Sequence, residues 1–242
     1  MSLRFIYRCL KARFKDEKWE LYSLMKHLND DDIFIDVGAN KGSYLLTMSK
    51  KVKKGMVYAF EPQPELSSYL RREIRDNKLQ NVVVEQVALS NQKGNSVLFI
   101  PGSNITSPSA TLVDRVNHET TNNYSVQTTT LDDYFSKISG SIGAIKIDVE
   151  GHERSVLEGA LKIIDIHKPL IICEIENRHL VNDSVNDLLE YFHQIGYTGF
   201  FVHKSKGLIK IDEFDSLIHQ YDKGEKFWNC KNYCNNFIMK KI

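Results

Sequence analysis

Three acidic side chains stand where buried strands are expected to end. They are Asp36, Glu61 and Asp148. Each belongs to or follows an apolar run rich in Val, Ile and Phe, which is typical of a strand buried on both faces. Carboxylates at the carboxyl ends of parallel strands can accept hydrogen bonds from the ammonium and hydroxyl groups of a ligand lying across those ends. The spacing therefore predicts a nucleoside-bearing ligand at one edge of a sheet.

The turn after the first run has the pattern Gly-x-x-x-Gly, from Gly38 to Gly42. A dinucleotide fold favours Gly-x-Gly-x-x-Gly, whose middle glycine admits a pyrophosphate against a helix N-terminus. The chain lacks that glycine, and it also lacks a Gly-x-x-x-x-Gly-Lys-Ser/Thr phosphate loop. The ligand need not carry phosphates, and this favours S-adenosylmethionine over a nicotinamide dinucleotide.

The residues that we expect to bind this cofactor come from four strand ends and from the first turn. They are Asp36, Gly38, Asn40, Gly42, Ser43, Glu61, Gln86, Ala88 and Asp148. Asp36 would accept hydrogen bonds from the ammonium group, and Glu61 would take both ribose hydroxyls with its two oxygens. Adenine would lie beside Gln86 and Ala88. Taken alone, Glu61 could equally be a surface acid before a helix that begins with proline.

A second group of polar residues follows the strand expected at 143–148. Asp148, Glu150 and His152 crowd its carboxyl end, next to the expected cofactor. Carboxylate and imidazole groups gathered in this way could act as a base that accepts a proton from a second ligand. We predict these three residues as the catalytic group. His152 could instead be a helix-start residue that hydrogen-bonds the backbone.

A metal-assisted reaction is the alternative mechanism. Asp148, together with Glu174, Glu176 or Asn177 at a later strand end, could hold a hard divalent cation through oxygen ligands. Those later residues could also be a polar strand end facing solvent. We favour a site without a metal. We interpret Cys230-x-x-x-Cys234 as two unrelated thiols, because a structural zinc site needs four ligands.

Strand and helix patterns alternate from residue 33 onward, which predicts a mainly parallel sheet with right-handed crossovers. The predicted strands are 33–37, 56–60, 82–87, 143–148, 169–175, 197–202 and 234–240, with a local strand at 96–100. The last two long strands lack a clear crossover helix, which favours an antiparallel hairpin at one sheet edge. Ser184 and Asp187 predict a capped helix start.

The remaining segments are less regular. Residues 3–28 have a helical apolar pattern, so we divide the chain into an extension, 1–30, and a catalytic domain, 31–242. The polar stretch 101–127 is either a substrate-covering loop, which we favour, or a surface excursion. Residues 203–230 form an insertion of unassigned structure.

Basic residues are concentrated at the N-terminus. They are Arg4, Arg8, Lys11, Arg13 and Lys15, and they stand beside Leu3, Phe5, Ile6 and Leu10. Such a helix can lie on a membrane surface. We favour the alternative, in which it packs on the catalytic domain or on another subunit.

Composition sets outer limits on function. The 242 residues suffice for one α/β domain with an extension, and the net charge of +1 provides no electrostatic case for nucleic-acid binding. The apolar runs are strand-sized, so we expect no integral membrane segment. The N-terminus lacks a signal-peptide pattern, and we expect a cytoplasmic location. The sequence is compatible with a homo-oligomer and with a monomer.

In these motifs the chain resembles the FkbM family of S-adenosylmethionine-dependent methyltransferases. The matching segments are 34–42, 59–62, 87–90, 130–133, 145–153 and 169–174. The most specific is Lys146-Ile147-Asp148-Val149-Glu150-Gly151-His152-Glu153. The first 30 residues and the insertion lie outside the resemblance.

The resemblance implies a class I methyltransferase fold. This Rossmann-like fold is a three-layer αβα sandwich whose seven-stranded, mostly parallel sheet has an antiparallel last strand. It also implies methylation of a hydroxyl on a sugar, a glycoconjugate or a secondary metabolite, so that the partner is a small-molecule or glycan acceptor. Two other functions are alternatives. One is a nicotinamide-dependent oxidoreductase, which the missing glycine disfavours, and the other is a non-catalytic binding module, which the intact acids disfavour.

Overall fold

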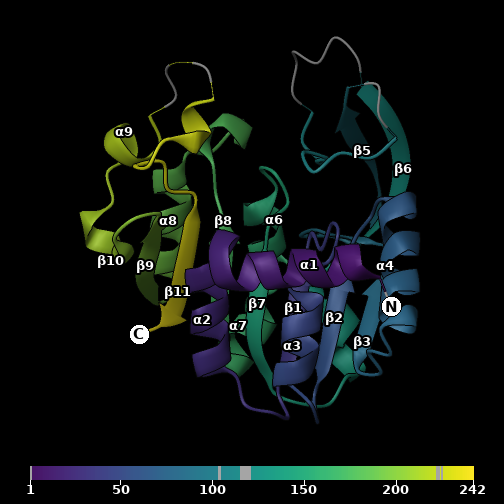
Figure 1. Cartoon of the computed structure of the whole chain (residues 1–242). Helices are drawn as coiled ribbons and strands as arrows, with labels where there is room; N and C mark the ends of the chain where they lie inside the picture. Colours follow the sequence, from purple (N-terminus) through teal and green to yellow (C-terminus); the bar gives the residue numbers. More distant parts are fainter. Residues whose placement is uncertain (1, 103–104, 115–120, 222–223, 225) are drawn as a thin grey trace.

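The computed structural model describes residues 2–102, 105–114, 121–221, 224 and 226–242. Within them, a central sheet has the strand order β10-β9-β11-β8-β7-β1-β2-β3. Its strands are β1 (Ile33–Val37), β2 (Met56–Phe60), β3 (Val82–Glu85), β7 (Ile142–Ile147), β8 (Leu170–Glu174), β9 (Tyr197–His203), β10 (Gly207–Lys210) and β11 (Asn236–Lys241). Figure 1 shows α2 and α3 in front of this sheet and α7 behind it, which makes three layers.

The centre of the sheet is buried on both faces because its strands are continuous apolar runs. All five residues of β1 are buried. Phe34 packs into the core on one face of the sheet, and Ile35 packs into the core on the other. Strands β3, β2, β1, β7 and β8 run parallel, so their carboxyl ends meet at one edge.

The predicted α/β architecture is confirmed, and the sheet edge differs from the prediction. β11 lies between β8 and β9 and pairs antiparallel with both. The edge strand is β10, an eighth strand that forms within the segment 203–230, for which the sequence predicts no strand. A tight turn allows this pairing, since His203 pairs with Gly207 and Gly207 has a φ of +80°. Such a short antiparallel strand carries little periodic signal in the sequence.

Helices connect the strands and cover both faces. They are α1 (Leu3–Lys11), α2 (Lys18–His27), α3 (Leu45–Lys51), α4 (Pro64–Asp76), α5 (Leu131–Tyr134), α6 (Glu153–Glu158), α7 (Leu161–His167), α8 (Val185–Gln194) and α9 (Ser216–His219). Pro64 occupies the first turn of α4, where a missing N–H is harmless. The predicted capping box of Ser184 and Asp187 begins α8. None of the helices in the described part of the chain is long and apolar enough to cross a membrane.

A second, three-stranded sheet rises beyond the carboxyl ends of the main sheet (Figure 1). It consists of β4 (Ala88–Leu89), β5 (Gly94–Pro101) and β6 (Thr121–Thr129). The local strand predicted at 96–100 is part of β5. The prediction of a loop over 101–127 was wrong for 121–127, because these residues pair with β5 in β6. Residues 103–104 and 115–120 of that predicted loop lie outside the described residues.

The N-terminal helices pack on the sheet layer that carries α3. Phe5 and Cys9 of α1 are fully buried, and the Cys9 thiol lies 3.4 Å from the carbonyl oxygen of Gly42. A π-helical turn (Ala12–Asp16) joins α1 to α2, and Glu17 after it accepts a hydrogen bond from the Tyr44 hydroxyl at 3.1 Å. The division of the chain at residue 30 stays a prediction.

Candidate active site

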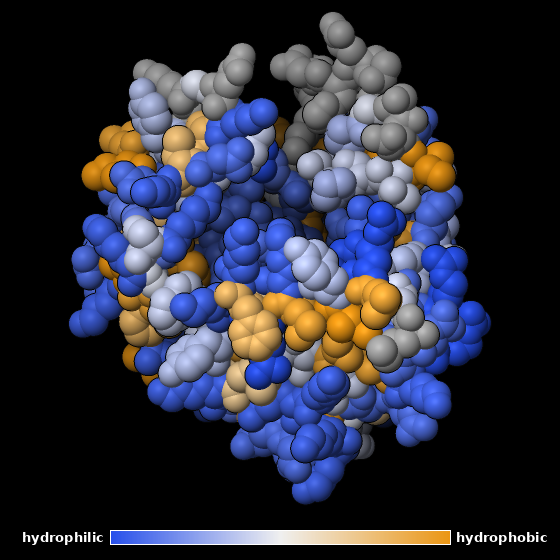
Figure 2. Space-filling view, viewed as in Figure 1, coloured by the Kyte–Doolittle hydropathy of each residue, from blue (hydrophilic) through white to orange (hydrophobic). Residues whose placement is uncertain are grey.

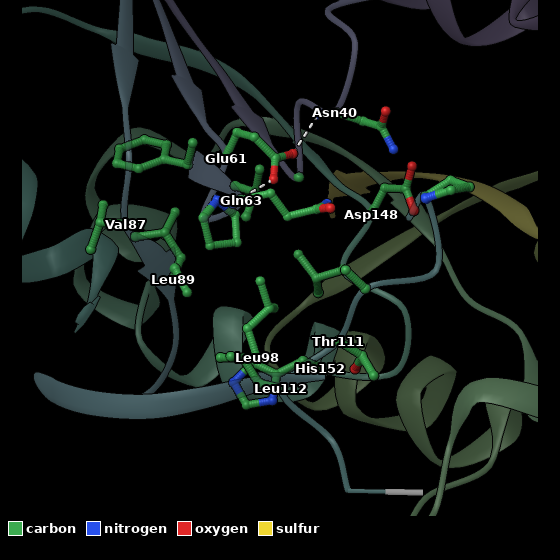
Figure 3. A pocket seen from close by; sticks show the side chains of 18 residues that line it. Asn40, Glu61, Gln63, Val87, Leu89, Leu98, Thr111, Leu112, Asp148 and His152 are labelled. Carbon is green, nitrogen blue, oxygen red and sulfur yellow. Dashed lines mark hydrogen bonds between the residues drawn. The ribbon is translucent and has the colours of Figure 1, made fainter. Parts of the chain in front are cut away.

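A pocket of about 560 Å³ opens where the carboxyl ends of β1, β2 and β7 meet (Figure 3). It is lined by Val37, Gly38, Asn40, Phe60, Glu61, Pro62, Gln63, Val87, Ala88, Leu89, Leu98, Pro108, Ala110, Thr111, Leu112, Asp148, Val149 and His152. Six predicted site residues are among them, namely Gly38, Asn40, Glu61, Ala88, Asp148 and His152. Neither Lys nor Arg occurs among these described lining residues.

Backbone geometry at Gly38 brings the first turn close to the loop after β7. Gly38 has a φ of +78°, and a Cβ atom there would lie 1.9 Å from the carbonyl oxygen of Asp148. Only glycine therefore fits this position. The backbone N–H groups of Gly38 and Ala39 both donate to the Phe60 carbonyl oxygen, at 3.0 Å each. The turn is thus fixed to the end of β2, directly before Glu61.

Glu61 is a carboxylate buried in the pocket wall, with 2% of its surface exposed. Its Oε2 accepts a hydrogen bond from the backbone N–H of Asn40 at 2.7 Å, and its Oε1 accepts one from Gln63 at 2.9 Å. Figure 3 shows both bonds and the carboxylate between the two segments. Burial raises the pKa of Glu61 to about 7, although these hydrogen bonds oppose the shift. Each carboxylate oxygen retains the capacity to accept a further hydrogen bond.

Lys146 stands between two carboxylates beneath the pocket. Its Nζ lies 3.0 Å from Asp148 Oδ2 and 3.7 Å from Asp36 Oδ1. Burial opposes its charge, but Asp148 and Asp36 together hold the pKa of Lys146 above its usual value. The Asp36 Oδ1 atom is buried and has no hydrogen-bond partner within the described part of the chain. Sequence reasoning placed Lys146 in a family motif without assigning it a role.

The loop after β7 is held by a buried acid. Glu150 has a φ of +58° and Gly151 a φ of +97°, so the chain turns sharply here. Glu153 Oε1 accepts hydrogen bonds from the N–H of Gly151 at 2.9 Å and of Val149 at 3.4 Å. The Glu150 carboxylate contacts His179 Nδ1. Sequence reasoning missed His179, whose only signal was its position shortly after β8, at the same edge of the sheet.

His152 lies on the apolar side of the pocket. Its Nε2 is 2.9 Å from the hydroxyl oxygen of Ser90. Figure 3 shows the ring beside Leu98 and Leu112, apart from Asp148. Burial lowers the pKa of His152 to about 4, so the ring is neutral at pH 7.

The segment 105–112 closes one side of the pocket. The Gln63 side chain holds it with two hydrogen bonds to Ser107: Gln63 Nε2 donates to the carbonyl oxygen at 3.0 Å, and the Ser107 N–H donates to Gln63 Oε1 at 2.9 Å. Thr111 Oγ1 donates to the Glu150 carbonyl oxygen at 2.8 Å. Leu112 belongs to this wall. Gln63 was missed, although it follows Glu61 by two residues.

The other predicted cofactor residues lie next to the pocket rather than in its lining. A Cβ at Gly42 would meet side-chain atoms of Leu70 and Leu45 at 2.8 and 2.9 Å, so Gly42 faces the helical layer. Asp36 faces Lys146, and Gln86 accepts a hydrogen bond from the Ser67 hydroxyl at 3.2 Å. Ser43 is half-buried in the turn before α3.

The residues weighed for a metal have other partners. Glu176 pairs with Arg178 at 2.6 Å and accepts a hydrogen bond from the Tyr233 hydroxyl at 2.6 Å. Asn177 Oδ1 accepts one from the Val185 N–H at 2.8 Å. Across the described ranges, no group of three or more His, Cys, Asp or Glu side chains is arranged to hold a metal ion.

Comparison with known proteins identifies a family. A family model described as methyltransferase FkbM domain matches residues 36–198. The chain is 27% identical over 150 residues to a protein named methyltransferase 1 from Beauveria bassiana, covering 54% of this chain and 59% of that one. It is 31% identical over 161 residues to hexuronic acid methyltransferase AglP from Haloferax volcanii, covering 65% and 61%. The chain thus spans about three fifths of the length of these relatives.

A solved structure agrees on the fold. It is that of a methyltransferase from Streptococcus mutans in complex with SAH, with a TM-score of 0.54, 11% identity, and coverage of 93% of this chain and 97% of that one. At this identity the likeness extends to the fold alone. Together with the parallel sheet and its antiparallel end, it shows the class I methyltransferase fold.

Proposed function

The chain belongs to the FkbM methyltransferase family, and from this premise we propose that it is an S-adenosylmethionine-dependent O-methyltransferase. The observation that carries the cofactor assignment is the Glu61 carboxylate, which lines the pocket although it is buried. Burying a charged carboxylate costs free energy unless hydrogen bonds or an opposite charge compensate for it. Glu61 has the position and the two oxygens required to accept both hydroxyls of a ribose.

The two sides of the pocket suit the two ends of such a cofactor. Val87, Leu98 and Leu112 form an apolar wall where adenine can lie. Asp148 lies on the acidic side, and the Asp36 carboxylate is buried behind it, next to Lys146. Acids there favour an ammonium and a sulfonium group. A lining without Lys or Arg among the described residues suits a ligand without phosphates.

Methyl transfer to oxygen requires alignment, exclusion of water and an acceptor for one proton. When bound, S-adenosylmethionine supplies a methyl group on a positively charged sulfur. The chain must then position a hydroxyl in line with that methyl group and receive the hydroxyl proton as the new C–O bond forms. The wall 105–112, held by Gln63 and Thr111, covers the pocket and can exclude water.

Of the three predicted catalytic residues, Asp148, Glu150 and His152, Glu150 is our proposed proton acceptor. Burial raises the pKa of the Glu150 carboxyl, and this makes its carboxylate a stronger base. Burial has the opposite effect on His152, whose ring is also held beside Ser90. We therefore assign His152 to the adenine side and Glu150, next to His179, to the acceptor side.

We propose a sugar hydroxyl, free or in a glycoconjugate, as the acceptor, with a secondary-metabolite hydroxyl as the broader class. Support for a sugar, as distinct from the group methylated on it, comes from the name of the relative from Haloferax volcanii, a hexuronic acid methyltransferase. The proposal is tested by incubating the protein with labelled S-adenosylmethionine and a panel of uronic acids, neutral sugars and small phenols. We expect label in an alkali-stable methyl ether of a sugar. Label found only in carboxyl esters or in amines would contradict O-methylation of a hydroxyl.

Cofactor affinity should depend on pH through Glu61. Its pKa of about 7 lies above the usual 4.5, so ionised Glu61 destabilises the ligand-free fold as pH rises from about 4.5 to 7. The ribose hydroxyls need the ionised form, and about a tenth of Glu61 is ionised one unit below its pKa. We therefore expect S-adenosylhomocysteine to bind about tenfold more weakly at pH 6 than above pH 8. Calorimetric titration of wild type and Glu61→Gln measures this, and an equal slope in both would reject Glu61 as its source.

A further inference from the structure

The outward face of α1 and the following π-helical turn carries an unusual set of side chains. Four large apolar residues are exposed: Leu3 by 78%, Tyr7 by 68%, Leu10 by 46% and Phe14 by 68%. Their spacing of four, three and four residues places them in one stripe along the helix. Figure 2, viewed as in Figure 1, shows an orange band across the front of the molecule, where α1 runs below the central hollow.

The inward face of the same helix packs against the rest of the protein. Phe5, Cys9 and Ala12 are buried against the sheet layer that carries α3. The Arg8 guanidinium donates to the carbonyl oxygen of Lys41 at 3.2 Å and to the Tyr69 hydroxyl at 3.0 Å. The helix is therefore fixed by one face and leaves its apolar stripe without a partner among the described residues.

The charges beside the stripe are of one sign. Arg4, Lys11 and Lys15 are exposed next to it, and residues 2–15 contain neither Asp nor Glu. The next acid along the chain is Asp16, which pairs with Lys11 at 2.6 Å. The whole chain has a net charge of only +1, so this basic character is local.

These charges distinguish between two possible partners of the face, a second copy of the chain and a lipid surface. Two copies of this face would place bases against bases, since residues 2–15 provide no acid to oppose them, and this repulsion disfavours self-association. An anionic lipid surface offers acyl chains to the apolar stripe and phosphate groups to the basic side chains. Leu and Phe can enter the boundary of the acyl chains while long Lys and Arg side chains reach the phosphates. Tyr7 suits the headgroup level, where aromatic rings with a polar end are enriched.

We propose that this face, Leu3 to Lys15, docks the protein on an anionic phospholipid membrane. The helix would lie in the plane of the interface. α1 contacts the turn 40–42 through Arg8 and Cys9, so docking would also bring this turn close to the membrane. The side of the molecule that holds the pocket would then face the lipid surface.

Co-sedimentation of the full chain with vesicles tests the docking. We expect binding to phosphatidylcholine vesicles that contain phosphatidylglycerol, weak binding to phosphatidylcholine alone, and a marked loss at high salt. Leu10→Ser/Phe14→Ser should lower the partition coefficient more than about tenfold, because two large apolar side chains no longer enter the interface. Arg4→Glu/Lys15→Glu should lower it by a similar factor. Leu217→Ser/Ile218→Ser, at two exposed apolar residues of α9, is the matched control and should bind as wild type does.

Three outcomes would overturn the proposal. They are no binding to the anionic vesicles, binding that Leu10→Ser/Phe14→Ser leaves unchanged, and equal binding to both kinds of vesicle. Analytical ultracentrifugation without lipid covers the remaining alternative. A wild-type dimer that Leu10→Ser/Phe14→Ser converts to a monomer would assign the face to a second copy of the chain. All the substituted side chains are exposed, so the melting temperatures of the variants should match that of wild type.

Discussion

Glu61→Ala is expected to weaken the binding of S-adenosylhomocysteine at least about 100-fold. In the proposed complex the Glu61 carboxylate accepts two ribose hydroxyls, and a hydrogen bond to a charged group contributes about 1.5–3 kcal/mol. Two such bonds correspond to at least about a 100-fold change in the dissociation constant. The substitution also removes the acceptor for the N–H groups of Asn40 and Gln63, and this loosens both walls of the pocket. Isothermal titration calorimetry at pH 8 measures the loss.

Two further variants test whether cofactor binding depends on the charge of Glu61 or on its shape. Glu61→Gln retains an oxygen for one backbone N–H but loses the charge, and we expect an intermediate loss of about 10-fold to 100-fold. Glu65→Gln changes an exposed acid in the first turn of α4 and should bind as wild type does. If Glu61→Ala keeps wild-type affinity while remaining folded, the ribose assignment is wrong.

Lys146→Met is expected to cause the largest loss of stability. The substitution leaves Asp36 as a fully buried carboxylate without its cation, and breaking a buried pair in this way costs about 3–5 kcal/mol. For a chain of this size, the melting temperature should fall by roughly 10 °C. Burial already raises the pKa of Asp36, and loss of Lys146 raises it further. The deficit should therefore shrink as pH falls and Asp36 takes up a proton. Thermal unfolding by circular dichroism at pH 5 and pH 8 measures both effects.

A double variant provides the control. Asp36→Asn/Lys146→Met removes both buried charges and should recover most of the stability that Lys146→Met loses. Lys162→Met replaces an exposed lysine of α7 and should leave the melting temperature unchanged. Equal melting temperatures for Lys146→Met and wild type would show that the Asp36–Lys146 pair contributes nothing to the fold.

The central sheet could be predicted because its strands are apolar runs bounded by turn residues. Runs such as 33–37 and 56–60 are buried on both faces, and their lengths match the observed strands. Elements that depend on pairing with distant partners could not be predicted in this way. β10 has only four residues, and β6 begins in a polar stretch that contains Asn122 and Asn123. Such strands are fixed by their partners, β9 and β5, and not by their own pattern.

The pocket could be predicted where a residue that lines it stands at the end of a strand. Glu61 and Asp148 are of this kind, and Gly38 was foreseen from the turn that follows β1. Residues that act through a second residue were missed, since their role depends on three-dimensional contacts. Gln63 holds Ser107, a residue 44 positions away in the chain, through hydrogen bonds. His179 contacts the Glu150 carboxylate through its Nδ1 atom. Neither contact leaves a periodic signal in the sequence.

A crystal structure of the protein grown with S-adenosylhomocysteine tests the central claim most directly. We expect the ligand in the pocket between Glu61 and Asp148, with both ribose hydroxyls within hydrogen-bonding distance of the Glu61 carboxylate and adenine against Val87 and Leu98. The account is contradicted if this pocket stays empty at saturating ligand. It is equally contradicted if the ligand occupies another pocket, such as the one lined by Lys15, Trp19 and Tyr233.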